Sequence, residues 1–580
     1  MIGDIDILWR RACATLVAAL FLAGVLTPAR AAAPAPLSDR DAALYQEIFE
    51  LQEEGDWPAA DAKIKDVEND VLMGYVKRQR LMHPTDYRSG FRELKAWMAY
   101  YADHPNADKV YRLAMKRRPK RASAPVRPRP RKWRATPTFE PHPALAADYA
   151  KTSRPRLAQI EGRERYLARR EEALKALNEI ERRRRERVIT DRQFDRMRTW
   201  IAASLYYQGY VDKARDIAEA ATDEHGDSGP LGLWIAGLIA YREGDIAKAH
   251  ERFAQMAKSP HQEDTLRAGA GFWAARTALA SGRLDAVAPN LEIAANHPFT
   301  FYGQLALAQL GRDYAYRWTP PKLSDAAYER LAERNPAVRR AAALAQVGRA
   351  SDADLELRWL NGAVEDADEA RDLLALAAAL DLPAAQLEIA SHRDGDAFEA
   401  GLYPVPDFAP TDGFTTDRAI LFALMRKESK FKADATSRVG ARGLMQLMPR
   451  TASFIAKDRS LATRAGRDKL YNPGFNLAVG QQYVNYLIEA SGDGGLFDVA
   501  AAYNGGPGNL RRWKQGLDDV SAPLLFIESL PSAETRDFVE SVLTNIWIYR
   551  ARLGQPAPSR DRVAAGGAPI YEALDALGRR

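Results

Sequence analysis

The spacing of apolar residues predicts helices along almost the whole chain between Leu37 and Ala400. Apolar positions recur three and four residues apart, in segments rich in alanine, leucine, arginine and glutamate with few β-branched runs. A tryptophan and a later glycine recur together in the middle of this region: Trp200, Trp234 and Trp273, then Gly209, Gly244 and Gly282. Another alanine-rich segment follows each glycine. The pattern therefore predicts pairs of helices, each joined by a turn at the glycine.

The intervals between these markers define a repeat. The tryptophans are 34 and 39 residues apart and the glycines 35 and 38. This is the period of tetratricopeptide-like stacks, in which each helix pair buries one face against the next. We therefore expect an all-α fold with an α-solenoid over residues 37–400. Gly55 and Gly348 mark degenerate copies of the same turn. Such a solenoid is either a peptide-binding scaffold or a frame that controls access to an enzyme.

The pattern changes after Ala400. Residues 401–410 contain three prolines and predict an extended linker. A second domain is then expected over residues 411–553. Every residue from 419 to 425 is apolar, which predicts a helix buried on all sides with Thr415 or Thr416 as its N-cap. Residues 554–580 begin with a stretch rich in proline, alanine and glycine, and we expect them to form a loose tail.

Glu428 is placed at the carbonyl end of that buried helix. The negative end of a helix dipole and burial both raise the pKa of a carboxyl group, so Glu428 is a candidate general acid that holds its proton at neutral pH. Gly440 and Gly443 then break the chain, and Pro449 suits the start of a new helix.

Length and composition favour a folded protein of several domains. The chain has 580 residues, of which 46% are hydrophobic. Residues 1–31 resemble a signal peptide, because Arg10 and Arg11 precede a short apolar run and a small-residue cleavage site. The run is short for a membrane span, although an uncleaved anchor is the alternative. Cys13, the only cysteine, lies inside this segment, so a mature periplasmic chain would have neither disulfides nor cysteine catalysis. The residues before Cys13 do not match a lipoprotein site.

A basic, proline-rich loop is expected over residues 116–140. Between residues 116 and 134 there are ten basic residues and no acidic one, whereas the whole chain carries a net charge of +6. Proline and self-repulsion oppose a packed helix, so we expect a mobile loop. It is suited to an anionic polymer or a membrane surface. A solvated insertion without a partner is the alternative, and nucleic acid is not expected for an exported chain. The arginines at 182–185 belong to a predicted helix over residues 159–188 and indicate a solvated helix face.

The chain offers no pattern for a metal or an organic cofactor. Its eight histidines show no paired ligand spacing, and neither a P-loop nor a dinucleotide-binding glycine pattern occurs. We therefore expect no metal site and no cofactor.

Four motifs between residues 428 and 536 resemble those of the soluble lytic murein transglycosylases. They are Glu428-Ser429, Gly443-Leu444-Met445-Gln446-Leu447-Met448-Pro449, Ala502-Tyr503-Asn504-Gly505-Gly506-Pro507-Gly508-Asn509, and Glu528-Ser529-Leu530-Pro531 with Glu534-Thr535-Arg536. Gly505 departs from the alanine usual in the family. The resemblance implies a periplasmic enzyme whose goose-lysozyme-like, mainly α catalytic domain is carried by a helical superhelix, and Phe301-Tyr302-Gly303 resembles an element of that superhelix.

The resemblance also implies a mechanism with one catalytic carboxyl group. A glycosidase normally needs two, and the residues alone offer Asp434 and Glu534 as partners for Glu428, each with a structural role as the alternative. In the family, the glutamate that Glu428 matches acts first as acid and then as base, and the substrate closes a 1,6-anhydro ring without water. The positions that match substrate-binding residues of the family are Ser429, Gln446, Met448, Tyr503, Asn504 and Glu534.

The expected function is thus cleavage of the β-1,4 bond between MurNAc and GlcNAc in peptidoglycan by a monomeric periplasmic enzyme. A lysozyme-like hydrolase and a catalytically weak glycan-binding scaffold are the alternatives.

Overall fold

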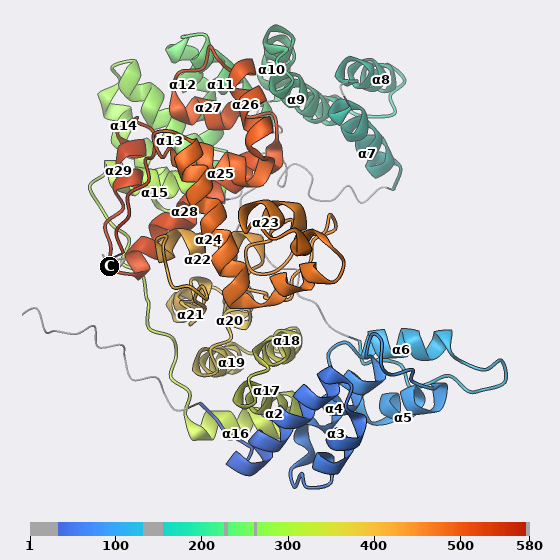
Figure 1. The fold of residues 1–580 in the computed structure, drawn as a ribbon. Helices are drawn as coiled ribbons and strands as arrows, with labels where there is room; N and C mark the ends of the chain where they lie inside the picture. Colours follow the sequence, from blue (N-terminus) through green and yellow to red (C-terminus); the bar gives the residue numbers. More distant parts are fainter. Residues whose placement is uncertain (1–32, 131–154, 171, 226–229, 260–263, 576–580) are drawn as a thin grey trace, which may run out of the picture. The chain divides into compact units, whose positions relative to one another are not determined.

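The computed structural model describes residues 33–130, 155–170, 172–225, 230–259 and 264–575 (Figure 1). The predicted signal peptide, residues 1–31, lies outside them. The chain divides into two compact units, and each combines an early stretch with a late one. The first comprises residues 1–135 and 319–406, and the second comprises residues 136–318 and 407–580.

The first unit is helical. Its helices are α2 (Asp39–Glu54), α3 (Trp57–Ile64), η1 (Asp70–Leu72), α4 (Met73–Leu81), α5 (Phe91–Tyr101), α6 (Ala107–Lys116), α16 (Asp325–Arg334), α17 (Pro336–Gln346), α18 (Ala350–Asn361), α19 (Ala367–Ala379), α20 (Pro383–Ala390) and α21 (Asp396–Leu402). A buried hydrogen bond joins its early and late stretches: Tyr75 donates at 2.8 Å to Glu356, which also pairs with Arg340 of the late stretch at 2.6 Å. α21 ends at Leu402, so the predicted linker of residues 401–410 starts inside a helix.

The second unit is also helical in the residues described. It contains α7 (Pro155–Arg169), α8 (Ala173–Arg185), α9 (Asp191–Tyr207), α10 (Val211–His225), α11 (Pro230–Arg242), α12 (Ile246–Ala257), α13 (Asp264–Ala280), α14 (Leu284–Ala295), α15 (Phe301–Gln309), α22 (Arg418–Glu428), α23 (Pro449–Ile455), η3 (Arg459–Ala462), η4 (Gly466–Tyr471), α24 (Pro473–Ala490), α25 (Leu496–Gly505), α26 (Pro507–Gly516), α27 (Pro523–Ser529), α28 (Ala533–Arg552) and α29 (Pro558–Ala564). Across the described ranges, β-structure is limited to isolated bridges.

The predicted helix pairs are present. α9, α11 and α13 carry the three tryptophans, and α10, α12 and α14 follow them. The connecting glycines all adopt positive φ angles, where a residue with a Cβ would be strained. The same holds for Gly55 between α2 and α3 and for Gly348 between α17 and α18. The three tryptophan side chains are buried, and the rings of Trp234 and Trp273, from successive pairs, lie 6.5 Å apart.

The single helix predicted over residues 159–188 is wrong, because two helices lie there. α7 ends at Arg169 and α8 begins at Ala173, although no proline or glycine marks the break. The Glu172 backbone N–H donates to the Leu167 carbonyl and closes the end of α7. The arginines of α8 do form a solvated face: Arg182 pairs with Glu186 and Arg183 with Glu179 along the same helix.

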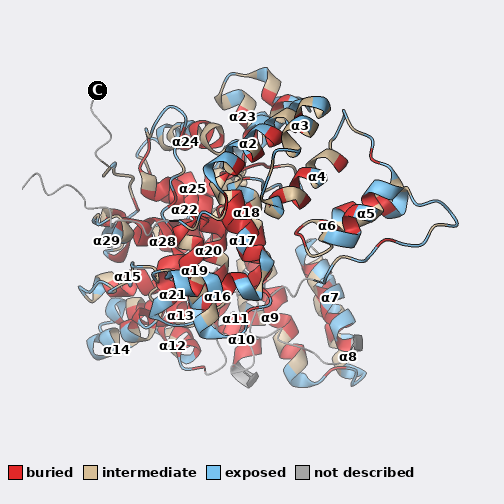
Figure 2. Ribbon diagram, turned by 90° about the horizontal axis from the view of Figure 1, so that it is seen from below, coloured by how far each residue is buried: buried red, intermediate tan, exposed pale blue. Residues whose placement is uncertain are grey.

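The buried helix predicted before Glu428 is α22, but its N-cap is Asp417 rather than a threonine. The two threonines bind α24 instead: the Thr415 backbone N–H donates to Gln481, and the Thr416 hydroxyl donates to Asn485. α22 packs against α28, and both are almost wholly buried (Figure 2).

The segment after Leu553 is ordered through residue 575, so the prediction of a loose tail was wrong. α29 packs on α15, and the chain then returns to the start of α22. Asp417 has no exposed surface; it receives the backbone N–H groups of Leu574 and Asp575 and a 2.8 Å hydrogen bond from Arg550. These contacts join residues more than 130 positions apart, which local patterns cannot reveal.

The structure describes the basic loop through Pro130. Residues 117–130 are non-helical, as predicted, and the Arg129 backbone N–H donates to the Ala102 carbonyl at 2.9 Å. The mobility of the loop stays a prediction. Residues 131–140 of the predicted loop lie outside the described residues. None of the helices in the described residues is long and apolar enough to span a membrane.

Candidate active site

Glu428 is the last residue of α22, and its side chain is half-buried. The apolar run before it fixes its position, because residues 419–425 are all buried. The ammonium group of the neighbouring residue, Lys427, donates to Asp537 at 2.8 Å and to Ser541 at 3.1 Å. These bonds connect the end of α22 to α28. The carboxyl group therefore stands on a rigid helix end, as a positioned acid requires.

Ser429 faces back into its own helix. Its Oγ donates to the Met425 carbonyl at 3.1 Å, and its side chain is buried. The hydroxyl thus caps a carbonyl at the end of α22, which is a structural role and not a contact with substrate.

The turn from Gly443 to Met448 forms a wall beside the site. Gly443 has φ +75°, and an added Cβ would overlap the Leu470 carbonyl oxygen and the Asn476 amide. Asn476, fully buried, accepts from the Met445 N–H at 2.8 Å and donates to the Arg442 and Leu470 carbonyls. Asn476 was not predicted from the sequence, because a single asparagine in a helical pattern carries no signal of a partner 34 residues earlier.

Gln446 and Met448 extend from this turn in different ways. The Gln446 amide donates to the Gly443 carbonyl at 2.8 Å and to the Ala435 carbonyl at 3.2 Å, and its backbone has φ +46°. These hydrogen bonds stabilise the conformation of the turn. Met448 is 40% exposed, so its thioether is available to a ligand.

Tyr503, near the end of α25, lies against the inner side of the turn. Its hydroxyl donates to the Met445 carbonyl at 2.7 Å, and its ring stacks on Phe538 at 6.0 Å. Burial raises the pKa of Tyr503 well above its usual value, and the charge of Glu428 raises it further. The phenol therefore stays protonated at neutral pH, and the charge of Glu428 acts on it through space.

Tyr483 on α24 is a further neighbour of Glu428 that the sequence analysis did not identify. Burial, Tyr486 and the Glu428 charge raise its pKa to about 12. Its ring lies 5.2 Å from that of Tyr503 and 6.5 Å from that of Tyr486. Phe454 continues the row at 5.9 Å from Tyr486, and these two outer rings are 67% and 40% exposed. An aromatic row thus leads from solvent to the neighbourhood of the acid.

Asn504 and Glu534 lie next to each other in the second unit. The Asn504 amide donates to Glu534 at 3.4 Å, and its carbonyl accepts from the Thr535 hydroxyl at 2.7 Å. Two predicted site residues from separate motifs are thus brought together, with the Glu534 side chain exposed. Asp434, the other carboxyl group considered as a partner for Glu428, is exposed in the loop after α22.

The part of the chain that holds Glu428 matches a known family. Residues 408–522 match the model of the transglycosylase SLT domain. These residues form an SLT domain. The soluble lytic murein transglycosylase of Salmonella typhimurium is 36% identical over 145 residues, and that of Escherichia coli 35% over 144. Each alignment covers 25% of this chain but only 22% of the relative, so the sequence similarity concerns the SLT domain and residues near it.

Solved structures extend the likeness in fold beyond the SLT domain. The 70 kDa soluble lytic transglycosylase of Escherichia coli aligns with a TM-score of 0.55 at 18% identity, over 91% of this chain and 88% of that one. An inactive mutant of the lytic transglycosylase Slt of Pseudomonas aeruginosa gives 0.55 at 20% identity, over 90% and 88%. The predicted fold class, an all-α superhelix with a lysozyme-like domain, is confirmed.

The motif that starts at Glu528 lies beyond the SLT match and binds α9 and α15. Tyr302 of α15 donates to Glu528, and Tyr206 of α9 shares a 2.7 Å hydrogen bond with Ser529. Glu540 of α28 is 1% exposed beside Glu528. Burial and the Glu528 charge raise the pKa of Glu540 well above its usual value. Burial raises the pKa of Glu528 as well, so this pair of carboxyl groups favours a protonated, less charged state.

The packing around position 505 explains why a glycine stands there. A Cβ on Gly505 would lie 2.5 Å from the Trp513 ring, so the tryptophan occupies the space of the alanine methyl group usual in the family. The departure at Gly505 therefore reflects the packing of α26 on the end of α25.

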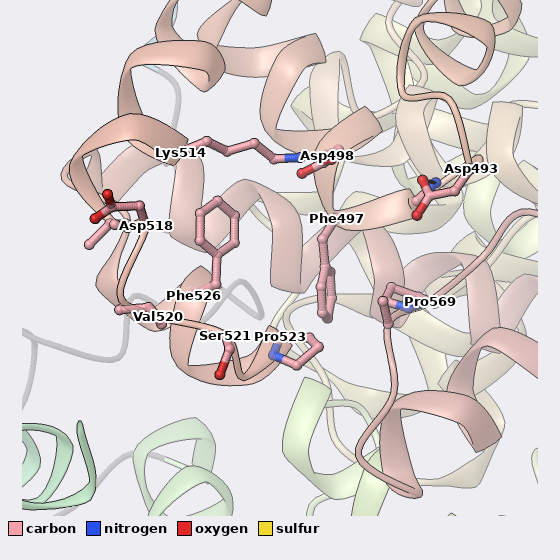
Figure 3. A pocket seen from close by; sticks show the side chains of 13 residues that line it. Asp493, Phe497, Asp498, Lys514, Asp518, Val520, Ser521, Pro523, Phe526 and Pro569 are labelled. Atoms are coloured by element: carbon pink, nitrogen blue, oxygen red, sulfur yellow. Dashed lines mark hydrogen bonds and ion pairs between the residues drawn. The ribbon is translucent and has the colours of Figure 1, made fainter. Parts of the chain in front are cut away.

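A cavity of about 360 Å³ opens at the other end of α25 from Tyr503 (Figure 3). Phe497 and Phe526 lie between Asp493 on one side and Asp518 on the other, and Lys514 points to Asp498. None of the predicted site residues lines it. In the part of the chain that the structure describes, no group of three or more histidine, cysteine or acidic side chains is placed to hold a metal ion.

Proposed function

We propose that this protein is a lytic transglycosylase that cleaves the β-1,4 bond between MurNAc and GlcNAc in peptidoglycan and leaves 1,6-anhydro-MurNAc ends. The observation that carries the proposal is the position of Glu428 within the SLT domain. Its carboxyl group ends a rigid, buried helix beside Tyr503 and Tyr483, two phenols that remain uncharged at neutral pH. One positioned carboxyl group in an aromatic, half-buried setting suits a general acid.

In the proposed reaction Glu428 acts twice. It first donates its proton to the glycosidic oxygen as the bond from that oxygen to C1 of MurNAc breaks, while the N-acetyl group of the same sugar stabilises C1. The Glu428 carboxylate then takes the proton from the C6 hydroxyl, and the C6 oxygen bonds to C1. The proton returns to Glu428, no water is consumed, and the enzyme is ready for another cycle. No second protein carboxylate is needed, consistent with the exposure of Asp434.

The remaining predicted site residues form the proposed substrate groove. Tyr503 and Gln446 hold the turn of residues 443–448 against the acid. Met448, Phe454 and Tyr486 offer exposed apolar faces on which the C–H faces of sugar rings can pack. Asn504 and Glu534 add hydrogen-bonding groups. Ser429 orders the end of α22.

The proposed substrate implies a location and a partner. The protein would act in the periplasm on glycan strands, after removal of residues 1–31, and would act as a monomer without a cofactor.

A lysozyme-like hydrolase is the second candidate, because the same acid and fold would serve if water attacked C1. Digestion of purified sacculi followed by mass spectrometry separates the two, because an anhydro end is lighter than a reducing end by one water. We expect anhydro ends with the wild type and at least about a hundredfold less product with Glu428→Gln, which removes the proton donor. Glu489→Gln, an exposed change on α24, is the matched control and should leave the rate unchanged. Reducing MurNAc ends would reject the lytic reaction, and full activity of Glu428→Gln would reject Glu428 as the acid.

A further inference from the structure

The basic loop of residues 117–130 forms one wall of a hollow in the first unit. The hollow has a volume of about 750 Å³. Pro128 and Pro130 flank Arg129 and restrict the backbone, and the Arg129 N–H anchors it to the Ala102 carbonyl at the end of α5. The loop is therefore held in an extended conformation at this point.

Aromatic and apolar side chains also line the hollow. They are those of Tyr111 from α6 and of Leu355 and Trp359, which are one turn apart on α18. All three side chains line the hollow and are half-buried. A concave site with aromatic walls and a few polar groups is the usual form of a ligand site.

Two of the polar residues that line the hollow are cationic. Arg127 and Arg129 are exposed, and their guanidinium groups make no ion pair or hydrogen bond with any residue that the structure describes. Other loop arginines are engaged: Arg117 donates to Ser89, and Arg118 donates to the Ala122 carbonyl. Asp108, the one acidic residue of the lining, pairs with Arg112 at 3.0 Å. Two guanidinium groups next to the hollow are thus left for an anionic ligand.

We propose that this hollow is a second glycan-binding site, outside the SLT domain, that takes a carboxylate-bearing glycan strand. The aromatic wall of Tyr111 and Trp359 packs against sugar rings, and Arg127 and Arg129 bind carboxylates by paired N–H donors. The identity of the polymer as peptidoglycan rests on the proposed function, because MurNAc and its peptide carry such carboxylates. The site would hold the enzyme on the sacculus independently of the chemistry at Glu428.

The geometry favours a glycan over a membrane surface. A membrane-binding segment places large apolar side chains beside its cations, so that they enter the bilayer. Residues 117–130 contain one such side chain, Val126, which is 52% exposed. The two unpaired arginines border a hollow with aromatic walls instead of a flat or convex apolar face.

The test measures binding without turnover. The full chain with Glu428→Gln is incubated with purified sacculi, with chitin as an uncharged glycan, and with anionic phosphatidylglycerol vesicles, and the bound fraction is measured by co-sedimentation. The site variant is Arg127→Gln with Arg129→Gln. The matched control is Lys120→Gln with Arg121→Gln, which removes the same charge from the same loop at exposed positions that do not line the hollow. Tyr111→Ala removes part of the aromatic wall.

We expect the site variant and Tyr111→Ala each to weaken sacculus binding by about tenfold, because a charge-assisted hydrogen bond or a buried aromatic face contributes on this scale. The control should change it by less than about twofold, because an exposed charge acts weakly at physiological salt. Chitin and vesicles should bind less than sacculi. Equal losses in site variant and control, unchanged binding in both, or tighter binding to vesicles would each overturn the proposal. Because the assay does not depend on turnover, failure here is distinct from the absence of anhydro products in the digestion of sacculi.

Discussion

The hydroxyl group of Tyr503 donates a hydrogen bond of 2.7 Å to the backbone carbonyl of Met445. The two residues are 58 positions apart and belong to separate motifs, so this bond connects the end of α25 to the turn of residues 443–448. The ring of Tyr503 also lies near Glu428, whose charge contributes to the raised pKa of the phenol. Tyr503 therefore connects the surroundings of Glu428 to the turn that forms the wall of the proposed groove.

Replacement of Tyr503 by phenylalanine tests this role. The ring and its stacking on Phe538 remain, but the buried Met445 carbonyl loses its donor from Tyr503, which costs about 1–3 kcal/mol of stability. We expect a lower Tm and a loss of turnover of about tenfold, because the turn moves relative to Glu428. Thermal unfolding and release of anhydro-muropeptides measure the two effects. Unchanged turnover with a lowered Tm would show that Tyr503 serves stability alone.

The helical architecture was predictable because its signals are local. Helix pairs around Trp200, Trp234 and Trp273 follow from the spacing of apolar residues, and the glycine turns follow from backbone conformation. The position of Glu428 at the end of a buried helix was predictable for the same reason, because the apolar run and the carboxyl group lie within a few residues of each other.

The features that the sequence did not reveal depend on distant partners. Thr415 and Thr416 are good N-cap residues, but α24 presents amides that bind both of them. Tyr483 and Asn476 lie on α24 with ordinary helical spacing, and only the fold brings them beside Glu428 and the 443–448 turn. The residues of the aromatic row are separated in the same way, so no local pattern identifies the row.

Gly443 and Gly440 provide a matched pair for the backbone of the turn. Both have positive φ, but an added Cβ at Gly440 meets no atom within 4 Å, whereas at Gly443 it overlaps Leu470 and Asn476. We expect Gly440→Ala to cost about 1–2 kcal/mol of stability from backbone strain alone. Gly443→Ala adds a steric clash and should cost about 2–5 kcal/mol, with loss of activity. Thermal unfolding of the two variants measures the difference, and equal Tm values would show that the turn adapts freely.

Truncation tests whether the C-terminal segment supports α22. Removal of residues 568–580 deletes the donors from Leu574 and Asp575 to Asp417 and the Arg418–Asp575 ion pair. Removal of residues 576–580 keeps all of them and is the control. We expect the longer truncation to cost about 3–5 kcal/mol, since several buried hydrogen bonds of about 1 kcal/mol each are lost and Asp417 remains buried. Thermal unfolding of both truncated chains measures the cost, and equal Tm values would contradict the role assigned to this segment.

The buried pair of Glu528 and Glu540 predicts a stability that depends on pH. Burial and the charge of Glu528 raise the pKa of Glu540 in the folded protein above its unfolded value of about 4.3. The folded state therefore binds this proton more tightly, so its stabilising effect is fully present below the unfolded pKa and is lost as pH rises through the folded pKa. Glu540→Gln keeps a donor toward Glu528 but cannot ionise.

We expect the Tm of Glu540→Gln to lie close to that of the wild type at about pH 4 and above it at about pH 8. At high pH the folded wild type must either bury a second charge or keep Glu540 protonated, and both lower its free energy of unfolding, whereas glutamine cannot ionise. Glu489→Gln changes an exposed carboxylate and should give the same difference from wild type at both pH values. The measurement is thermal unfolding across this range in buffers of equal ionic strength. A wild-type Tm that rises relative to Glu540→Gln as the pH increases would have the wrong sign. It would mean that Glu540 is ionised and stabilised by a cation.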